Sequence, residues 1–246
     1  MARRQKPLCC SISTARDVSH ERACSPCVKR RNLFAPPGPS GNHVVMYFVD
    51  FEASSLGELG FPIEIAWTDQ NGQGETYLIR PADEWLTPGN PAWSAASERI
   101  HGISFATLME EGVPCEQVAR RAARVLGSKQ VFACSDAPPF DGRWLEMLLA
   151  AGSQPPAVRL LDVQRVYGWA CRPLLDLLPL VDEPGHESAE ERLRNMVNDI
   201  VTGAEDEEAL RPRVQHRALP DAESLWRTWR SIRERVARRL TEEGWR

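Results

Sequence analysis

Five residues at three places in the chain have side chains that could together perform metal-dependent chemistry. Asp50 and Glu52 are two residues apart, Asp141 stands much later, and His216 and Asp221 are separated by five positions. Carboxylate oxygens are the ligands that Mg²⁺ and Mn²⁺ prefer, and a histidine can act as a general base near neutral pH. Four carboxylates and one histidine therefore indicate a site for two divalent ions and a general base, which is the combination that phosphodiester hydrolysis needs.

The pair Asp50 and Glu52 follows the most apolar run of the chain, Val44–Val49, which is typical of a central strand buried on both faces. Side chains two residues apart on a strand point to the same face. Both carboxylates are thus expected at the carboxyl end of this strand, where open α/β sheets bind ligands, and they are unfavourable there unless cations neutralise them. Because Asp and Glu make up 34 of 246 residues, an Asp-x-Glu pair alone is weak evidence, and a solvated strand end is the alternative.

The other three residues are expected near the ends of helices. Asp141 is predicted in the first turn of a helix, where the helix dipole favours an acidic side chain. Asp136 could serve as a cap in the same way, and it is the main rival of Asp141 for a role at the metal. Asp221 is predicted in the first turn of a helix that begins at Pro220, with His216 in the preceding loop, so both can face one site.

These positions require a mixed α/β fold. Two further strands, Ile63–Trp67 and Glu75–Ile79, are joined by a turn at Asn71-Gly72 and predict an antiparallel meander with the first strand. Later segments predict strands at 131–134 and 158–162 and helices at 115–126, 142–151, 173–181, 188–202 and 220–240. We expect a mixed five-stranded sheet, flanked by helices, whose first three strands form the meander. The acidic run Glu205–Glu208 is expected in a solvated turn or helix end.

The bulk composition is that of a soluble globular protein. Of the 246 residues, 42% are hydrophobic and 26% are charged. No apolar run approaches the roughly 18–20 residues that span a bilayer, so no membrane partner is expected. With a net charge of −4, local basic patches or bound cations would have to attract a nucleic acid. The seven cysteines are odd in number and scattered, which argues against a secreted disulfide framework and favours the reducing cytoplasm.

Residues 1–42 differ from the rest of the chain. They are rich in Arg, Ser, Cys and Pro, lack hydrophobic periodicity and predict a disordered extension, which leaves 43–240 as the folded domain. Zinc ligands could come from four cysteines and one histidine in this extension: Cys9, Cys10, Cys24, Cys27 and His20. The first cysteine pair is adjacent rather than spaced, which favours incidental cysteines over a zinc-dependent regulatory domain.

Taken together, the motifs resemble those of the DEDDh subgroup of DnaQ-like 3′–5′ exonucleases, which includes polymerase proofreading subunits, ribonuclease T and oligoribonuclease. The resemblance covers about residues 44–232. Three segments are similar to the three motifs of the family: Asp-Phe-Glu-Ala-Ser at 50–54, Phe-Asp-Gly-Arg-Trp-Leu at 140–145 and His-Arg-Ala-Leu-Pro-Asp-Ala at 216–222. Arg-Ile-His-Gly-Ile at 99–103 is similar to a segment that the family places near the terminal nucleotide. The family often has His-Asn where this chain has Ser135-Asp136, which could alter substrate contacts but removes no expected metal ligand.

The resemblance implies a ribonuclease H-like fold with two bound ions, Mg²⁺ or Mn²⁺. Asp50, Glu52 and Asp221 would hold the main ion, with Asp50 shared by the second ion. Asp141 would act directly or through water, and His216 would deprotonate the attacking water. Five residues are the candidate substrate contacts: Ala53, Ser54, Leu56, His101 and Phe105. For the two apolar side chains Leu56 and Phe105, which could contact terminal bases, core packing is the alternative.

Two hypotheses of different classes follow. The first is a two-metal 3′–5′ exonuclease that acts on the 3′ end of DNA or RNA and releases nucleoside 5′-monophosphates, alone, as a homodimer or beside a polymerase. The second is a catalytically retired fold that only binds nucleic acid or a polymerase. The first is favoured, because a retired site has no reason to retain all five catalytic residues.

The last predicted helix is basic. Trp226 and Trp229 are expected to anchor it to the core rather than to stack on bases. Its arginines predict either a phosphate-contacting face or a solvated surface paired with Glu: Arg227, Arg230, Arg233, Arg235, Arg238 and Arg239.

Overall fold

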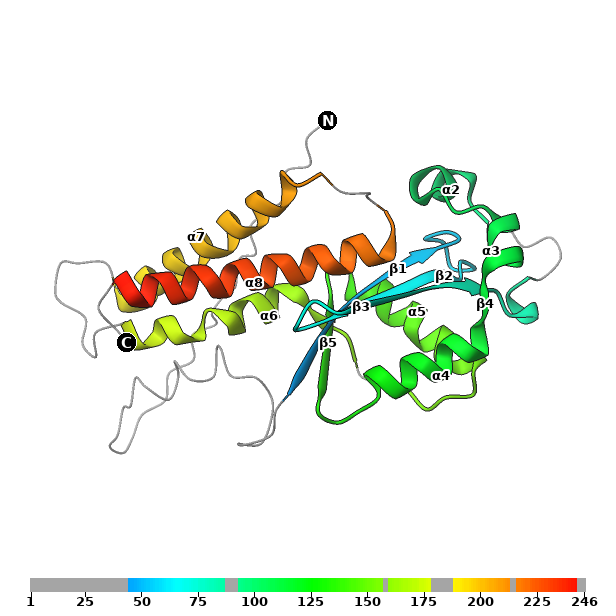
Figure 1. The fold of residues 1–246 in the computed structure, drawn as a ribbon, viewed down its shortest axis with the longest axis horizontal. Helices are drawn as coiled ribbons and strands as arrows, with labels where there is room; N and C mark the ends of the chain where they lie inside the picture. Colours follow the sequence, from blue (N-terminus) through cyan, green and yellow to red (C-terminus); the bar gives the residue numbers. More distant parts are fainter. Residues whose placement is uncertain (1–43, 87–92, 157–158, 178–187, 213–215, 243–246) are drawn as a thin grey trace, which may run out of the picture.

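The computed structural model describes residues 44–86, 93–156, 159–177, 188–212 and 216–242. The predicted amino-terminal extension and its cysteines lie outside the described residues. Within them, a mixed sheet lies between two layers of helices, which confirms the predicted α/β class (Figure 1). None of the helices in these ranges combines the length and the apolarity that crossing a membrane would require.

In the described residues the sheet has six strands, in the order β4-β3-β2-β1-β5-β6. Their bounds are β1 (Val45–Ala53), β2 (Pro62–Asp69), β3 (Gly74–Arg80), β4 (Val113–Pro114), β5 (Val131–Ser135) and β6 (Leu161–Asp162). The antiparallel pairing of β1 with β2 and of β2 with β3 confirms the predicted meander. The predicted five strands omit β4, which is parallel to β3 and too short to give a hydrophobic period.

Helices cover both faces of this sheet (Figure 1). One face carries α4 (Cys115–Leu126) and α5 (Pro138–Ala151), and the other carries α6 (Val163–Ala170), α7 (Ala189–Ala209) and α8 (Ala218–Glu242). Three short elements, η1 (Asp83–Trp85), α2 (Ala95–His101) and α3 (Phe105–Glu111), follow β3 in the chain. A further short helix, η2 (Arg172–Leu177), follows α6.

The central strand β1 sends alternate side chains into two hydrophobic cores. Val49 and Phe51 pack in the core beneath α4 and α5, whereas Phe48 packs in the core beneath α6, α7 and α8. Because side chains alternate along a strand, Asp50 and Glu52 lie on the same face as Phe48. Both carboxylates therefore face the layer that contains α8.

Several segments differ from the predictions. In the described part of the expected strand 158–162, which is 159–162, only Leu161–Asp162 pairs in the sheet. The described part of the helix expected at 173–181 lies in the 3₁₀ helix Arg172–Leu177, and 178–181 lie outside the described residues. The run Glu205–Glu208 does end a helix, α7, but Glu208 is buried rather than solvated because it forms an ion pair with Arg227 at 2.8 Å. The short helices α2, α3 and α6 were not predicted.

Trp226 and Trp229 hold α8 against the sheet, as predicted. The Trp229 ring lies 5.5 Å from that of Phe48, and the Trp226 indole N–H donates to the carbonyl of Gln70 at 3.2 Å. Gly72 has a φ of +85° in the β2–β3 turn, and a Cβ there would lie 2.5 Å from the Trp226 ring. The turn therefore needs glycine both for its backbone conformation and for the approach of α8.

Four of the six arginines of α8 have acidic partners, which favours the Glu-paired surface over a row of free phosphate contacts. The pairs within 4.0 Å are Arg227–Glu208, Arg227–Glu223, Arg230–Glu234, Arg235–Glu207 and Arg239–Glu242.

Candidate active site

Three elements bring the predicted residues to one edge of the sheet. Asp50 and Glu52 stand at the carboxyl end of β1. The neighbouring parallel strand β5 leads directly into α5, and the first turn of α5 holds Asp141. The first turn of α8, which packs across β1 and β2, holds Asp221, with His216 just before the helix. Asp141 and Asp221 thus lie in the first turns of their helices, as predicted.

The functional groups form two adjacent clusters. One ligand atom from each of Glu52, His216 and Asp221 lies within 4.8 Å of the others. The carboxylates of Asp50, Asp136 and Asp141 form a second cluster with the same spacing. A cavity of about 370 Å³ is lined by members of both clusters: Asp50, Glu52, Asp136, His216 and Asp221. The structure thus joins all five residues that the sequence singled out, and it adds Asp136.

Burial and mutual repulsion raise the pKa values of the carboxyl groups. The pKa of Asp50 lies well above its ordinary value because the side chain is buried, and the charges of Asp141 and Asp136 raise it further. Burial raises the pKa of Glu52 to about 8, with a further contribution from Asp221. Burial also raises the pKa of Asp141 to about 7. Near neutral pH this arrangement is unfavourable unless cations share the oxygens.

The donor set fits hard divalent cations. Asp141 is only 4% exposed, and its Oδ2 has no hydrogen-bond partner among the described residues. A buried polar atom without a partner is uncommon and requires an explanation. A Mg²⁺ or Mn²⁺ ion held by carboxylate oxygens would satisfy this atom and neutralise the cluster.

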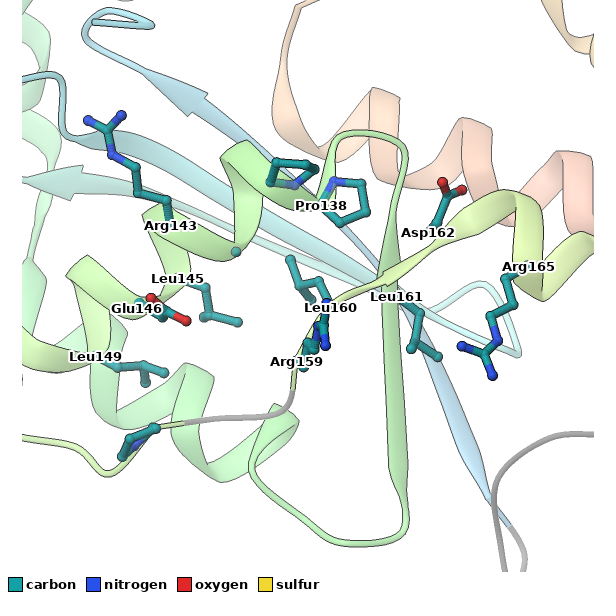
Figure 2. A pocket seen from close by; sticks show the side chains of 13 residues that line it. Pro138, Arg143, Leu145, Glu146, Leu149, Arg159, Leu160, Leu161, Asp162 and Arg165 are labelled. Carbon is teal, nitrogen blue, oxygen red and sulfur yellow. The ribbon is translucent and has the colours of Figure 1, made fainter. Parts of the chain in front are cut away.

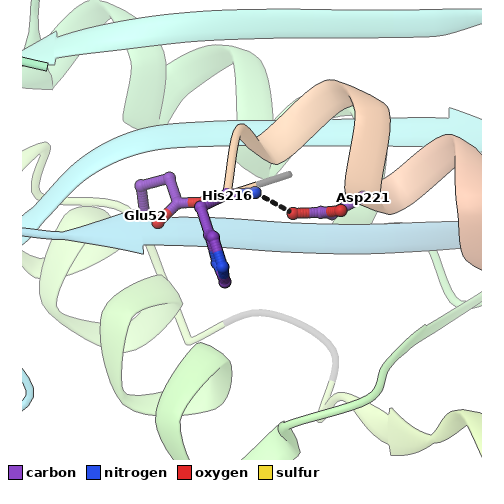
Figure 3. A group of neighbouring side chains, drawn as sticks. All are labelled: Glu52, His216 and Asp221. Atoms are coloured by element: carbon purple, nitrogen blue, oxygen red, sulfur yellow. Dashed lines mark hydrogen bonds between the residues drawn. The ribbon is translucent and has the colours of Figure 1, made fainter. Parts of the chain in front are cut away.

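His216 has an unusual backbone conformation at the entry to α8. Its φ is +59°, in the left-handed region that side chains with a Cβ disfavour. Its backbone N–H donates to the Asp221 carboxylate at 2.9 Å, and Figure 3 shows His216 between Glu52 and Asp221. Such conformations persist where surrounding contacts hold them, and they are common at functional sites. Asp221 therefore offers a carboxylate to the site and also fixes the position of the histidine.

Glu64 is a residue of the site that the sequence did not single out. It stands on β2 opposite Glu52, and it is 2% exposed. Its carboxylate accepts two hydrogen bonds from the Arg217 guanidinium, at 3.0 and 2.7 Å, and one from the Ala218 N–H at 2.9 Å. This bidentate contact fastens the start of α8 to the sheet between His216 and Asp221. In the sequence Glu64 is only one acidic residue within an apolar strand, and its partners lie more than 150 positions away.

The candidate substrate contacts occupy different environments. Leu56 is 70% exposed and Phe105 is 38% exposed, so neither belongs to the buried core, which was the alternative for both. His101 is buried, and its Nδ1 accepts the N–H of Ile103 at 3.0 Å, which leaves the proton of the neutral ring on Nε2. Burial lowers the pKa of His101 and so favours this neutral form.

Ala53 is the last residue of β1 and Ser54 begins the β1–β2 loop, and both are buried. The Ser54 hydroxyl accepts the Phe61 N–H at 3.0 Å, and the Ser54 N–H donates to the Phe61 carbonyl at 2.9 Å. The structure thus gives Ser54 a part in closing this loop, and its contact with substrate stays a prediction.

A larger cavity, of about 850 Å³, lies between α5 and the segment around β6 (Figure 2). Its acidic side chains, Glu146 and Asp162, stand on different elements, and neither belongs to a metal-ligand cluster of the described residues. Arg143, which lines this cavity, donates to three carbonyls of the β1–β2 loop, at 2.9, 2.7 and 3.4 Å. The candidate chemistry therefore lies in the smaller cavity.

No protein-family model matches the sequence, and no curated protein sequence does. Among solved structures, the chain is similar to the zinc-bound complex of Escherichia coli exonuclease I with single-stranded DNA, with a TM-score of 0.53 at 15% identity over 82% of this chain and 43% of that chain. It is similar to the E. coli exonuclease I complex with a dT13 oligonucleotide, with a TM-score of 0.52 at 15% identity over 81% of this chain and 43% of that one. A product-bound exonuclease I matches with a TM-score of 0.51 at 15% identity over 82% of this chain and 46% of that one.

The matches show the fold, and they span less than half the length of the exonuclease I chains. The described part of this chain has the mixed α/β, ribonuclease H-like fold of exonuclease I, which the resemblance to DnaQ-like exonucleases predicted.

Proposed function

We propose that the chain is a metal-dependent 3′–5′ exonuclease that releases nucleoside 5′-monophosphates. One observation carries the proposal: four carboxylates and a histidine, far apart in the sequence, lie at one edge of an exonuclease I-like sheet. They belong to two clusters, and within each cluster the ligand atoms lie within 4.8 Å of one another. The 15% identity supports the fold only, so the chemistry rests on these side chains.

The proposed roles combine the two clusters with the resemblance to DnaQ-like exonucleases. Glu52 and Asp221, which share one cluster, would hold one ion together with Asp50, as the resemblance implies, and Asp50 with Asp141, which share the other cluster, would hold the second. When bound, two such ions stabilise the attacking and leaving oxygens of an in-line displacement. His216 removes a proton from the attacking water as its oxygen bonds to phosphorus and the bond from phosphorus to the 3′ oxygen of the preceding nucleotide breaks. Because the His216 side chain is exposed, the proton can pass on to solvent.

The terminal nucleotide would contact the segments beside this edge. Leu56 in the β1–β2 loop and Phe105 at the start of α3 offer apolar surface for bases. The Nε2–H of His101 is a donor without a partner among the described residues, and because it is buried it could bind an oxygen of the sugar or phosphate only after a local rearrangement. The matched exonuclease I complexes contain single-stranded DNA, which makes it the first substrate to test.

The test is degradation of a single-stranded oligonucleotide with Mg²⁺ or Mn²⁺. A 5′-labelled strand should give a ladder of shortened products, and a 3′-labelled strand should release labelled 5′-monophosphate in the first step. Asp50→Ala should abolish both reactions and His216→Ala should slow them about 100-fold or more. Asp206→Ala, on the exposed part of α7, is the matched control and should keep full activity.

Single-stranded DNA, RNA and dinucleotides should be compared, because recognition of a ribose 2′-OH depends on pocket shape. If none of these substrates is degraded by the wild-type chain with either ion, the exonuclease proposal is wrong. Binding of the oligonucleotide without degradation would instead support the catalytically retired module.

A further inference from the structure

Asp136 is a carboxylate of the site to which the proposed mechanism gives no role. Strand β5 ends at Ser135, and the last parallel pair of β1 with β5 is Phe48 with Cys134. Two residues beyond that pair stand Asp50 on one chain segment and Asp136 on the other. The register therefore carries Asp136 to the level of Asp50, and an oxygen of each lies within 4.8 Å of the other and of Asp141.

The position of Asp136 is not that of a helix cap. Helix α5 begins at Pro138, and its N-cap residue is Ala137, so Asp136 lies one residue before the cap. It lines the cavity that the catalytic residues share.

A second, independent observation points to a ligand between these three residues. Asp141 is 4% exposed, and its Oδ2 finds no hydrogen-bond donor among the described residues. The atom is thus cut off from water and left beside two further carboxylates, Asp50 and Asp136. A cation bound by one oxygen of each carboxylate would explain both the unsatisfied Oδ2 atom and the close approach of the three carboxylates.

We infer that Asp136 is a fifth carboxylate of the metal centre and binds, directly or through a water, the ion shared by Asp50 and Asp141. The inference rests on the metal centre of the proposed function. It places three carboxylates around the second ion, Asp50, Asp136 and Asp141, instead of two. Because ligand charge sets the affinity of such sites, the second ion is held more tightly than two carboxylates would hold it.

The experiment is a Mn²⁺ titration of the full chain, with free Mn²⁺ followed by electron paramagnetic resonance. Asp136→Asn removes the charge and keeps the shape, and because Asp136 is exposed the fold should survive, which a thermal melt would check. Wild type should bind two ions. In the variant, the dissociation constant of the weaker ion should rise about tenfold or more, and that of the tighter ion should stay unchanged. The control Asp206→Asn removes the same charge from exposed α7 and should match wild type at both ions.

Equal dissociation constants for the weaker ion in Asp136→Asn and wild type would overturn the assignment of Asp136. Failure of wild type to bind Mn²⁺ would overturn it too. If wild type binds two ions and Asp136→Asn weakens one, but no oligonucleotide is degraded, the assignment of Asp136 stands and the proposed exonuclease function fails.

Discussion

Replacement of Glu64 by Gln tests whether the start of α8 is fastened to the sheet by one buried carboxylate. Glu64 is 3% exposed in its side chain and accepts three hydrogen bonds, two of them from a guanidinium. A hydrogen bond to a charged group contributes about 1.5–3 kcal/mol. Arg217 is 39% exposed and can turn to water, which reduces the loss. We expect Glu64→Gln to lower the free energy of unfolding by about 2–3 kcal/mol, measured by urea denaturation.

The matched control is Glu75→Gln. Glu75 also forms a bidentate pair from a strand to a helix, with Arg121 on α4, but both side chains are more than one third exposed. Its replacement should cost no more than about 1 kcal/mol. Equal losses of unfolding free energy in the two variants would refute the conclusion that Glu64 fastens α8 to the sheet. A positioning role also predicts that Glu64→Gln lowers kcat about tenfold or more with little change in KM, since displacement of catalytic groups affects the chemical step.

Three further predictions follow from single features. In EDTA the chain should lose thermal stability from about pH 5 to about pH 8, because groups with folded pKa values raised above their unfolded values, Glu52 and Asp141, favour the folded state only while protonated. Millimolar Mg²⁺ should raise the melting temperature more at the higher pH, and a flat profile in EDTA would contradict the proposed crowding of carboxylates. Gly72→Ala should lower the free energy of unfolding by about 2–4 kcal/mol, because the new Cβ meets both a positive φ and the Trp226 ring. Gly102→Ala, which has a positive φ but open space around it, should lower it by only about 1 kcal/mol. Urea denaturation measures both values, and equal losses would contradict the role of the Trp226 contact. Leu56→Ala should raise the KM for single-stranded DNA about fivefold at unchanged kcat, because this exposed side chain is proposed to contact only substrate, and an unchanged KM would exclude that contact.

The sequence predicted the parts of the site that depend on local pattern. The apolar run before Asp50 and the two-residue spacing to Glu52 each reflect one strand, and the structure places them accordingly. The last helix begins at Ala218 rather than at Pro220, but Asp221 lies in its first turn as predicted. Features that depend on distant partners were missed. Glu64 is a single acid in an apolar strand until Arg217 meets it across 153 positions, and the burial of Glu208 requires Arg227 on the next helix.

The carboxylates of Glu52 and Glu64 lie opposite each other in the sheet, and the repulsion between them is relieved differently for each. They are directly opposed on neighbouring strands, where like charges repel. Glu64 is neutralised within the protein, because Arg217 binds both of its oxygens. The same guanidinium lowers the pKa of Glu52, but burial, Asp221 and Glu64 outweigh it, so the pKa stays high. One member of the opposed pair is thus used to fix α8, and the other, Glu52, holds its proton near neutral pH unless a bound cation balances its charge. Arg217→Met should therefore loosen α8 and, in the metal-free chain, raise the pKa of Glu52 further, as measured by NMR titration, because it removes the guanidinium that lowers this pKa and leaves the charge of Glu64 beside Glu52.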